Sequence, residues 1–255
     1  MTTRVDAIYR YPVKGLSPQR LARTTLTPGA TLPADRLYAI ENGPSGFDPA
    51  APAYFPKQRF LMLMRNERLA TLRTDYDEAT HTLVIHAEGR EAARGDLRTP
   101  EGRQVIEGFF AGFMPDELRG PPKVLFGSGH PHSFSDVSKK VVSIINLASV
   151  AAVETVVGAA VHPLRFRGNL YVAGWPAWQE FELMSRELEV GGARLKVIKR
   201  IVRCAATDVD PDTGIRDLKL PRSLMQNFGH ADCGVYAEVV TGGDIVEGDA
   251  LNLVP

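Results

Sequence analysis

Cys204 is the residue in this chain whose type and setting suggest chemistry most directly. It is one of only two cysteines in 255 residues, and it ends the segment KRIVRC, in which Lys199, Arg200 and Arg203 are cationic. Cationic neighbours favour the thiolate form of a cysteine. Four roles fit this pattern: a small buried core residue, a redox thiol, a catalytic nucleophile or a metal ligand.

The second cysteine lies too far along the chain to form a familiar pair with the first. Cys233 and Cys204 are 29 residues apart, and the sequence contains no CxxC. This spacing argues against a zinc site and against a thioredoxin motif. Ligation of a soft, high-valent metal by the single thiolate of Cys204 remains open.

The stretch LRFRGNL, residues 164–170, is a second candidate site. Arg165, Arg167 and Asn169 are spaced two apart, so a strand would place all three on one face. Two guanidinium groups and a carboxamide suit a phosphate or a polar heterocycle. An ordinary solvent-exposed strand face is the alternative.

Several weaker signals surround these two sites. Lys14 lies in YPVKGL, and Arg36 follows Asp35 just before an expected strand. SDVS at 135–138 offers hydroxyls and a carboxylate, although a cap or turn explains it equally well. DVDPDTG at 208–214 lacks the EF-hand glycine and terminal glutamate, so it is read as a turn. HPH at 130–132 suggests a metal pair or, more simply, a loop.

Composition limits the class of protein. Lys plus Arg and Asp plus Glu number 30 each, so the formal net charge is zero, which argues against a general nucleic-acid binder. Two cysteines suit a reducing compartment. The N-terminus has no apolar signal segment. The longest apolar run, 141–161, is interrupted by polar residues and predicts a buried strand and helix. These features predict a cytoplasmic protein without membrane insertion.

Alternating apolar residues and frequent turn residues predict a mainly β fold with a few helices. Strands are expected within 4–14, 19–29, 36–41, 68–76, 81–89, 141–146, 165–174, 186–204 and 233–254, and the last of these is expected to form a hairpin. Helices are expected from the N-cap Thr99 to about residue 115 and over 147–157, ending at Gly158. A joint between two halves is expected near residue 120.

The order of these motifs resembles the MOSC family, named after the C-terminal domain of molybdenum cofactor sulfurase, and within it the amidoxime-reducing members. The resemblance rests on YPVKGL, a Gly29 to Asp35-Arg36 segment, RFRGN, W-x-E, L-x-V-G, RC-x-x-T-x-VDPDTG, CGVYAEVV and a final G-x-x-x-x-GD. It implies a β-barrel-like N-terminal domain at 1–120 and a β-barrel MOSC domain at 121–255.

The resemblance also implies roles for individual residues. Cys204 matches the cysteine that supplies a thiolate to molybdenum, and Arg203 beside it would help to keep the sulfur deprotonated. The residues matched to contacts with the molybdopterin cofactor are Lys14, Arg36, Asp136, Ser138, Arg167, Asn169 and Tyr236. Gly168 departs from the family pattern, which often has proline there.

The function implied is reduction of small N-hydroxylated or N-oxide compounds by molybdenum. No C-terminal iron–sulfur module follows the last strands, so electrons would come from a separate haem or iron–sulfur protein. A sulfur carrier that uses a Cys204 persulfide without retained metal is the alternative, and a degenerate binding protein that has lost the cofactor is a third. No lysine stands in a Schiff-base context, so pyridoxal phosphate is not expected.

Overall fold

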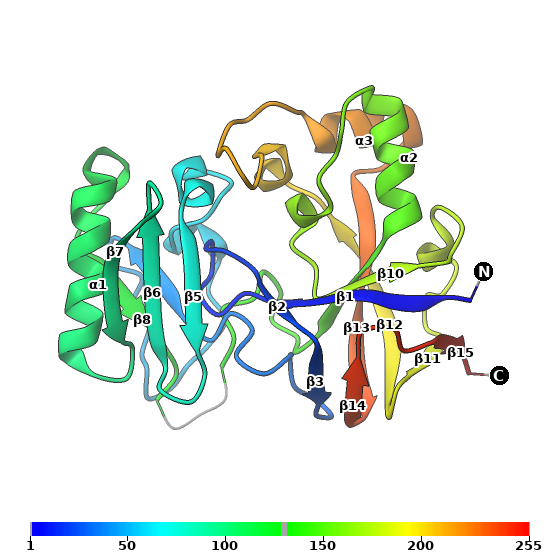
Figure 1. Cartoon of the computed structure of the whole chain (residues 1–255), viewed down its shortest axis with the longest axis horizontal. Coiled ribbons are helices and arrows are strands. Elements are labelled where there is room, and N and C mark those ends of the chain that lie inside the picture. Colours follow the sequence, from blue (N-terminus) through cyan, green and yellow to red (C-terminus); the bar gives the residue numbers. More distant parts are fainter. Residues whose placement is uncertain (1, 129–131, 255) are drawn as a thin grey trace.

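The structure is a computed structural model that describes residues 2–128 and 132–254. Across these residues it contains fifteen β-strands and three α-helices, so the mainly β fold class is confirmed. Two groups of strands lie side by side, and both chain termini lie beside the larger group (Figure 1). No helix in the described residues is long and apolar enough to cross a membrane.

The larger group is built on an eight-stranded sheet in the order β15-β11-β12-β13-β9-β10-β1-β2. Its strands are β1 (Arg4–Arg10), β2 (Gln19–Leu21), β9 (Val142–Asn146), β10 (Leu170–Ala173), β11 (Glu187–Val190), β12 (Ala193–Val202), β13 (Asp232–Thr241) and β15 (Leu251–Leu253). A separate pair joins β3 (Arg23–Leu26) to β14 (Gly243–Val246).

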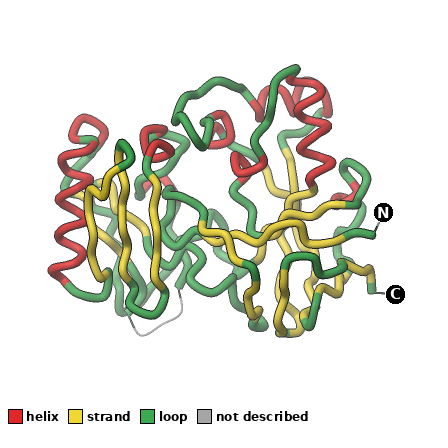
Figure 2. The backbone as a smooth tube through the Cα atoms, viewed as in Figure 1, coloured by secondary structure: helices red, strands yellow, loops and turns green. Residues whose placement is uncertain are grey.

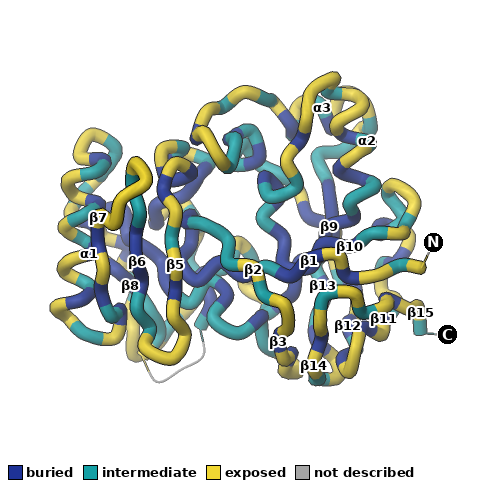
Figure 3. The backbone as a smooth tube through the Cα atoms, viewed as in Figure 1, coloured by how far each residue is buried: buried dark blue, intermediate teal, exposed yellow. Residues whose placement is uncertain are grey.

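Strand β9 is buried along its whole length (Figure 3). Its side chains alternate between two faces. Val142 and Ile144 enter the main core of the sheet, whereas Ile145 packs with the helices on the other face. A strand covered on both faces is mostly apolar along its length, and this explains the sequence VVSII, in which Ser143 is the single polar residue.

The helices that cover this second face are α2 (Leu147–Val157) and α3 (Leu220–Phe228). The Asn146 side chain caps α2 by accepting from the Ala148 amide, and Gly158 ends it in the left-handed conformation with φ of 70°. The predicted bounds of α2 are therefore confirmed. Helix α3 was not predicted from the sequence.

The smaller group consists of the sheet β5-β6-β7 and the pair β4-β8, with one helix packed on the sheet (Figure 2). The elements are β4 (Ala39–Asn42), β5 (Arg73–Asp77), β6 (Thr82–Ala87), β7 (Arg90–Asp96), α1 (Pro100–Phe113) and β8 (Pro122–Leu125). The predicted N-cap of α1 is confirmed, since the Thr99 side chain accepts from the Gly102 amide at 3.0 Å. Ile106 and Phe110 of α1 lie in the core of this group.

Three local expectations were wrong. The final segment does not form a hairpin, because β14 pairs with β3 and β15 pairs with β11. Residues 67–71 form a 3-10 helix instead of a strand. Residues 163–166 also form a 3-10 helix, and Arg167 follows it in the left-handed conformation with φ of 49°. The face shared by Arg165, Arg167 and Asn169 therefore does not exist.

The N-terminal strands cross from one group to the other. β1 pairs with β10, and β3 pairs with β14, so both belong to the sheets of the C-terminal half. The chain then leaves β1 and runs through Tyr11–Leu16 toward the smaller group. A domain boundary near residue 120 stays a prediction.

Candidate cofactor site

A pocket of about 270 Å³ lies between the two groups of strands. Eight of its 25 lining residues are basic and two are acidic, although the whole chain is neutral. A pocket lined by one sign of charge concentrates ligands of the opposite sign. The basic residues are Lys14, Arg36, Lys57, Arg165, Arg167, Lys199, Arg200 and Arg203, and the acidic ones are Asp35 and Asp136.

The face of the large sheet that points away from its main core forms one side of the pocket. Tyr236 of β13 is paired with Lys199 of β12 on one side and with Ser143 of β9 on the other. Because Val235 and Ala237 point into the main core, the alternation of the strand turns Tyr236 to the opposite face. Burial raises the pKa of Tyr236 above its ordinary value.

Asn169 is held firmly at the edge of this face. Its side-chain oxygen accepts from the amide and the hydroxyl of Ser143 at 3.0 and 2.8 Å. Its side-chain nitrogen donates to the Tyr9 carbonyl at 3.1 Å. Asn169 therefore joins β9 to the end of β1, and it lines the pocket while being 2% exposed.

Arg36 and Arg167 stack on the ring of the buried Tyr11. Their guanidinium carbons lie 4.5 and 4.2 Å from the ring centre. Arg36 also donates to the Arg167 carbonyl at 2.9 Å, and Arg167 donates to the Leu16 carbonyl at 2.8 Å. Burial lowers the pKa of Arg167. Burial acts the same way on Arg36, but Asp35 outweighs it and raises the pKa.

Lys14 and Lys57 share the carboxylate of Asp136. Lys14 donates to Asp136 and to the Phe134 carbonyl, the latter at 2.8 Å, and Lys57 donates to the other oxygen of Asp136 at 2.9 Å. Burial lowers the pKa of Lys14. Burial alone would raise the pKa of Asp136, but the two lysines hold it well below its usual range. The three charges form one connected group.

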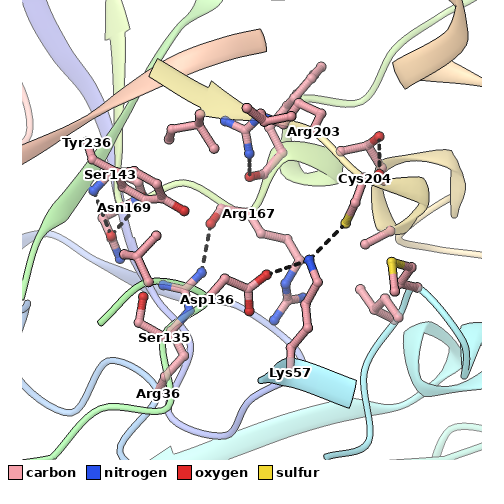
Figure 4. A pocket seen from close by; sticks show the side chains of 18 of the residues that line it. Arg36, Lys57, Ser135, Asp136, Ser143, Arg167, Asn169, Arg203, Cys204 and Tyr236 are labelled. Carbon is pink, nitrogen blue, oxygen red and sulfur yellow. Dashed lines mark hydrogen bonds and ion pairs between the residues drawn. The ribbon is translucent and has the colours of Figure 1, made fainter. Parts of the chain in front are cut away.

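The sulfur of Cys204 meets this group through Lys57. The Lys57 ammonium lies 3.3 Å from Sγ, and Figure 4 shows the two side chains pointing toward each other. Cys204 is partly buried and precedes the 3-10 helix Ala205–Asp208, where its carbonyl accepts from the amide and hydroxyl of Thr207. Burial would lower the pKa of Lys57, but Asp136 and Cys204 outweigh it and raise the pKa.

Arg203 binds backbone carbonyls rather than the neighbouring sulfur. Its Nε donates to the Cys233 carbonyl at 2.7 Å, and its Nη1 donates to the Phe166 carbonyl at 2.8 Å. The cation hydrogen-bonded to Cys204 is Lys57, in a Pro-rich loop 147 positions earlier. Arg203 thus joins the backbone at Cys233 to the backbone at Phe166.

Arg165 plays a structural part that the sequence did not indicate. Its guanidinium lies 2.9 Å from an Asp210 oxygen and 2.7 Å from an Asp217 oxygen, and it donates to the Asp208 carbonyl at 3.1 Å. Its side chain is only 1% exposed. The 208–214 turn is confirmed, because the Asp210 side chain accepts from the amides of residues 212 and 213. Arg165 ties this turn to the RFRGN segment.

The pocket brings together all but one of the residues that the family resemblance matched to the metal or the cofactor. Those that line it are Lys14, Arg36, Asp136, Arg167, Asn169, Arg203, Cys204 and Tyr236. Ser138 is exposed and is not among the lining residues, whereas Ser135 and Ser143 are. Sequence reasoning also missed Lys57, because nothing in a Pro-rich loop marks one lysine as functional.

The remaining sequence signals lie away from this pocket. Cys233 is fully buried, and burial raises the pKa of its thiol to about 12. Residues 130 and 131 of HPH lie outside the described residues. Within residues 2–128 and 132–254, no group of three or more His, Cys, Asp or Glu side chains could hold a metal ion.

Two mitochondrial amidoxime-reducing components are similar in sequence to this chain. Human mitochondrial amidoxime-reducing component 1 is 30% identical over 177 residues, which cover 64% of this chain and 50% of the relative. Bovine mitochondrial amidoxime reducing component 2 is 32% identical over 120 residues, which cover 42% of this chain and 35% of the relative. The matches span half or less of these relatives.

A solved structure, the YUAD protein from Bacillus subtilis, covers 98% of this chain and 94% of its own, with a TM-score of 0.45 and 12% identity. The model of the MOSC N-terminal beta barrel domain matches residues 2–113, and that of the MOSC domain matches residues 124–252. The MOSC domain match covers half of the chain, and the resemblance seen in the sequence is confirmed: this chain belongs to the MOSC-domain family.

Proposed function

We propose that this protein is a molybdenum-cofactor-dependent oxidoreductase that reduces small N-hydroxylated or N-oxide compounds. The observation that carries the proposal is the position of Cys204, whose sulfur faces a pocket lined by eight basic residues. A thiolate is a suitable ligand for a soft metal, and the surrounding cations suit an anionic cofactor. The names of the relatives, which describe amidoxime reduction, support this choice.

The side chains fit the chemical groups of a molybdopterin. Lys14 and Arg36 would hold its phosphate, since ammonium and guanidinium groups bind phosphate through charge-assisted hydrogen bonds. Arg167, Asn169 and Tyr236 would meet the polar pterin ring. A bound molybdenum centre would supply two-electron redox chemistry, and Cys204 would be its protein ligand.

The overall reaction needs a second protein. Reduction of an N-hydroxyl compound breaks the N–O bond, takes up two electrons and two protons, and releases the oxygen as water. In this proposal a separate haem or iron–sulfur protein delivers the electrons, which the similarity to the amidoxime-reducing components supports, and solvent delivers the protons.

The first test is the metal and pterin content of protein purified from a host that makes the cofactor. Wild type is compared with Cys204→Ser, and Cys233→Ser is the control because that thiol is fully buried. We expect near-stoichiometric molybdenum and pterin in wild type and Cys233→Ser, and loss of molybdenum in Cys204→Ser. Absence of both from wild type would overturn the proposal and favour a persulfide on Cys204, which mass spectrometry detects.

A further inference from the structure

Lys57 has an unusual place in the pocket. It is the first residue of the 3-10 helix Lys57–Arg59, in the N-terminal half, and it reaches the sulfur of Cys204 in the C-terminal half. Its ammonium therefore lies beside the atom that would hold the metal. A ligand that approaches the sulfur of Cys204 from the pocket would meet this positive charge.

The Lys57 ammonium is fixed and retains a donor. Asp136 accepts a hydrogen bond from Lys57 and another from Lys14. The Lys57 ammonium is therefore held by a carboxylate that is itself fixed. An ammonium has three N–H donors. Two of them serve Asp136 and Cys204, and no third protein acceptor is present among the described residues. The side chain is 23% exposed and lines the pocket, so a ligand in the pocket can contact it.

Apolar residues also line the pocket, in the segments 63–64 and 202–206. Leu63, Met64, Val202 and Ala206 line the pocket together with Cys204. Arg216 fixes the two segments against each other, because it donates to the carbonyls of residues 63, 64 and 205 at 2.7 to 2.9 Å. The pocket therefore combines apolar lining residues with the Lys57 cation that is anchored at Cys204.

We propose that Lys57 is a specificity-determining residue that selects apolar compounds whose reacting group is an oxyanion or a strong hydrogen-bond acceptor, and that disfavours cationic compounds. Hydroxamates and N-oxides belong to the favoured class, whereas amidines and amines belong to the disfavoured class. The inference rests on the proposed function for the identity of the reaction. The charge selectivity itself is independent of turnover.

The physical reason is Coulombic. At hydrogen-bond distance near a protein surface, a unit charge stabilises an opposite charge and destabilises a like charge, and the value of this interaction rises as the local dielectric constant falls. Ordinary solvent screening and the nearby Asp136 reduce this value. A net preference of about tenfold, as for one charge-assisted hydrogen bond, is the expected scale.

Binding of two unreactive isosteres tests the inference without turnover. Benzoate and benzamidinium have the same ring and opposite charges. Their dissociation constants are measured by calorimetry with the protein as purified from a cofactor-producing host. Wild type is compared with Lys57→Met and Lys57→Gln, and with Lys139→Met as control, since Lys139 pairs with Glu238 and does not line the pocket.

We expect wild type and Lys139→Met to bind benzoate more tightly than benzamidinium. Both Lys57 variants should shift the ratio of the two constants by about tenfold toward benzamidinium. A ratio in folded Lys57→Met or Lys57→Gln that stays within about twofold of wild type would overturn the inference. So would wild-type protein that binds neither compound in the millimolar range.

A kinetic comparison separates this inference from the proposed function. Benzhydroxamic acid carries a carbonyl oxygen on the carbon where benzamidoxime carries an amino group, so only the former presents a carbonyl acceptor, and an artificial reductant supplies the electrons. We expect Lys57→Met to lower kcat/KM for benzhydroxamic acid by about tenfold more than for benzamidoxime. Equal losses would refute the role of Lys57 while leaving the reductase intact. No reduction of either compound by metal-loaded wild type would refute the reductase, and the binding ratio would still decide on Lys57.

Discussion

Replacement of Arg165 by methionine should destabilise the fold strongly, although this arginine was first read as a ligand-binding residue. Its side chain is 1% exposed and pairs with Asp210 and Asp217, which are 22% and 44% exposed. Methionine fills a similar volume but leaves both carboxylates and the Asp208 carbonyl without their partner. The 208–214 turn that follows Cys204 then loses its attachment to the RFRGN segment.

The magnitude follows from the burial of the pair. Removal of one partner from a fully buried pair costs about 3–5 kcal/mol. Solvent reaches both carboxylates here and offsets part of the loss, so we expect about 2–4 kcal/mol from Arg165→Met. That is a large fraction of the total stability of about 5–15 kcal/mol that is typical of a folded protein.

Urea denaturation followed by far-UV circular dichroism measures this loss. Arg20→Met is the matched control, because Arg20 also pairs with a carboxylate, Glu247, but its side chain is 60% exposed. An exposed pair contributes about 0–1 kcal/mol. If Arg165→Met lost less than about 1 kcal/mol, no more than the control, the assignment of Arg165 as an anchor for the turn would be wrong.

Two further stability measurements check other parts of the structure. A Cβ at position 168 would lie 2.3 Å from Ile145 Cγ1, so Gly168→Ala should cost about 1–3 kcal/mol in urea denaturation. Gly108→Ala in helix α1 is the control, because its Cβ would meet nothing within 4 Å, and it should be neutral or stabilising by up to about 1 kcal/mol. Burial, with a smaller contribution from Lys140, lowers the pKa of His132 to about 4. The unfolded chain therefore takes up this proton at higher pH than the folded one, and stability should fall as pH drops from about 6.5 to about 4. His132→Gln should lose less free energy of unfolding over that range, and an unchanged pH profile would contradict the assignment.

Predictions that depended on a few neighbouring residues were the accurate ones. The cap at Thr99 and the left-handed end at Gly158 were both foreseen, because a helix end is determined within about one turn of chain. Helix α3 was missed. Its sequence LPRSLMQNF begins without a side-chain cap and offers only nine residues of periodicity.

Predictions that depended on pairing across the chain were less accurate. The GGD segment reads as a hairpin turn, yet β14 pairs with β3, more than 200 residues away. Turn residues specify that the chain bends, but they do not specify which strand edge is free to receive it. The same limit applies to Arg165 and Arg167, whose spacing predicted a shared face before a 3-10 helix and a left-handed residue separated them.

The sequence by itself determined the mainly β fold class, the helix caps and eight of the 25 residues that line the pocket, because periodicity, capping chemistry and motif order are properties of local stretches of chain. Tertiary structure decided which charges meet. Arg203 is adjacent to Cys204 in sequence, yet its guanidinium binds backbone carbonyls, while Lys57 crosses from the other half to reach the sulfur. Side-chain contacts across 147 residues arise from the packing of two groups of strands, and no local pattern encodes that distance.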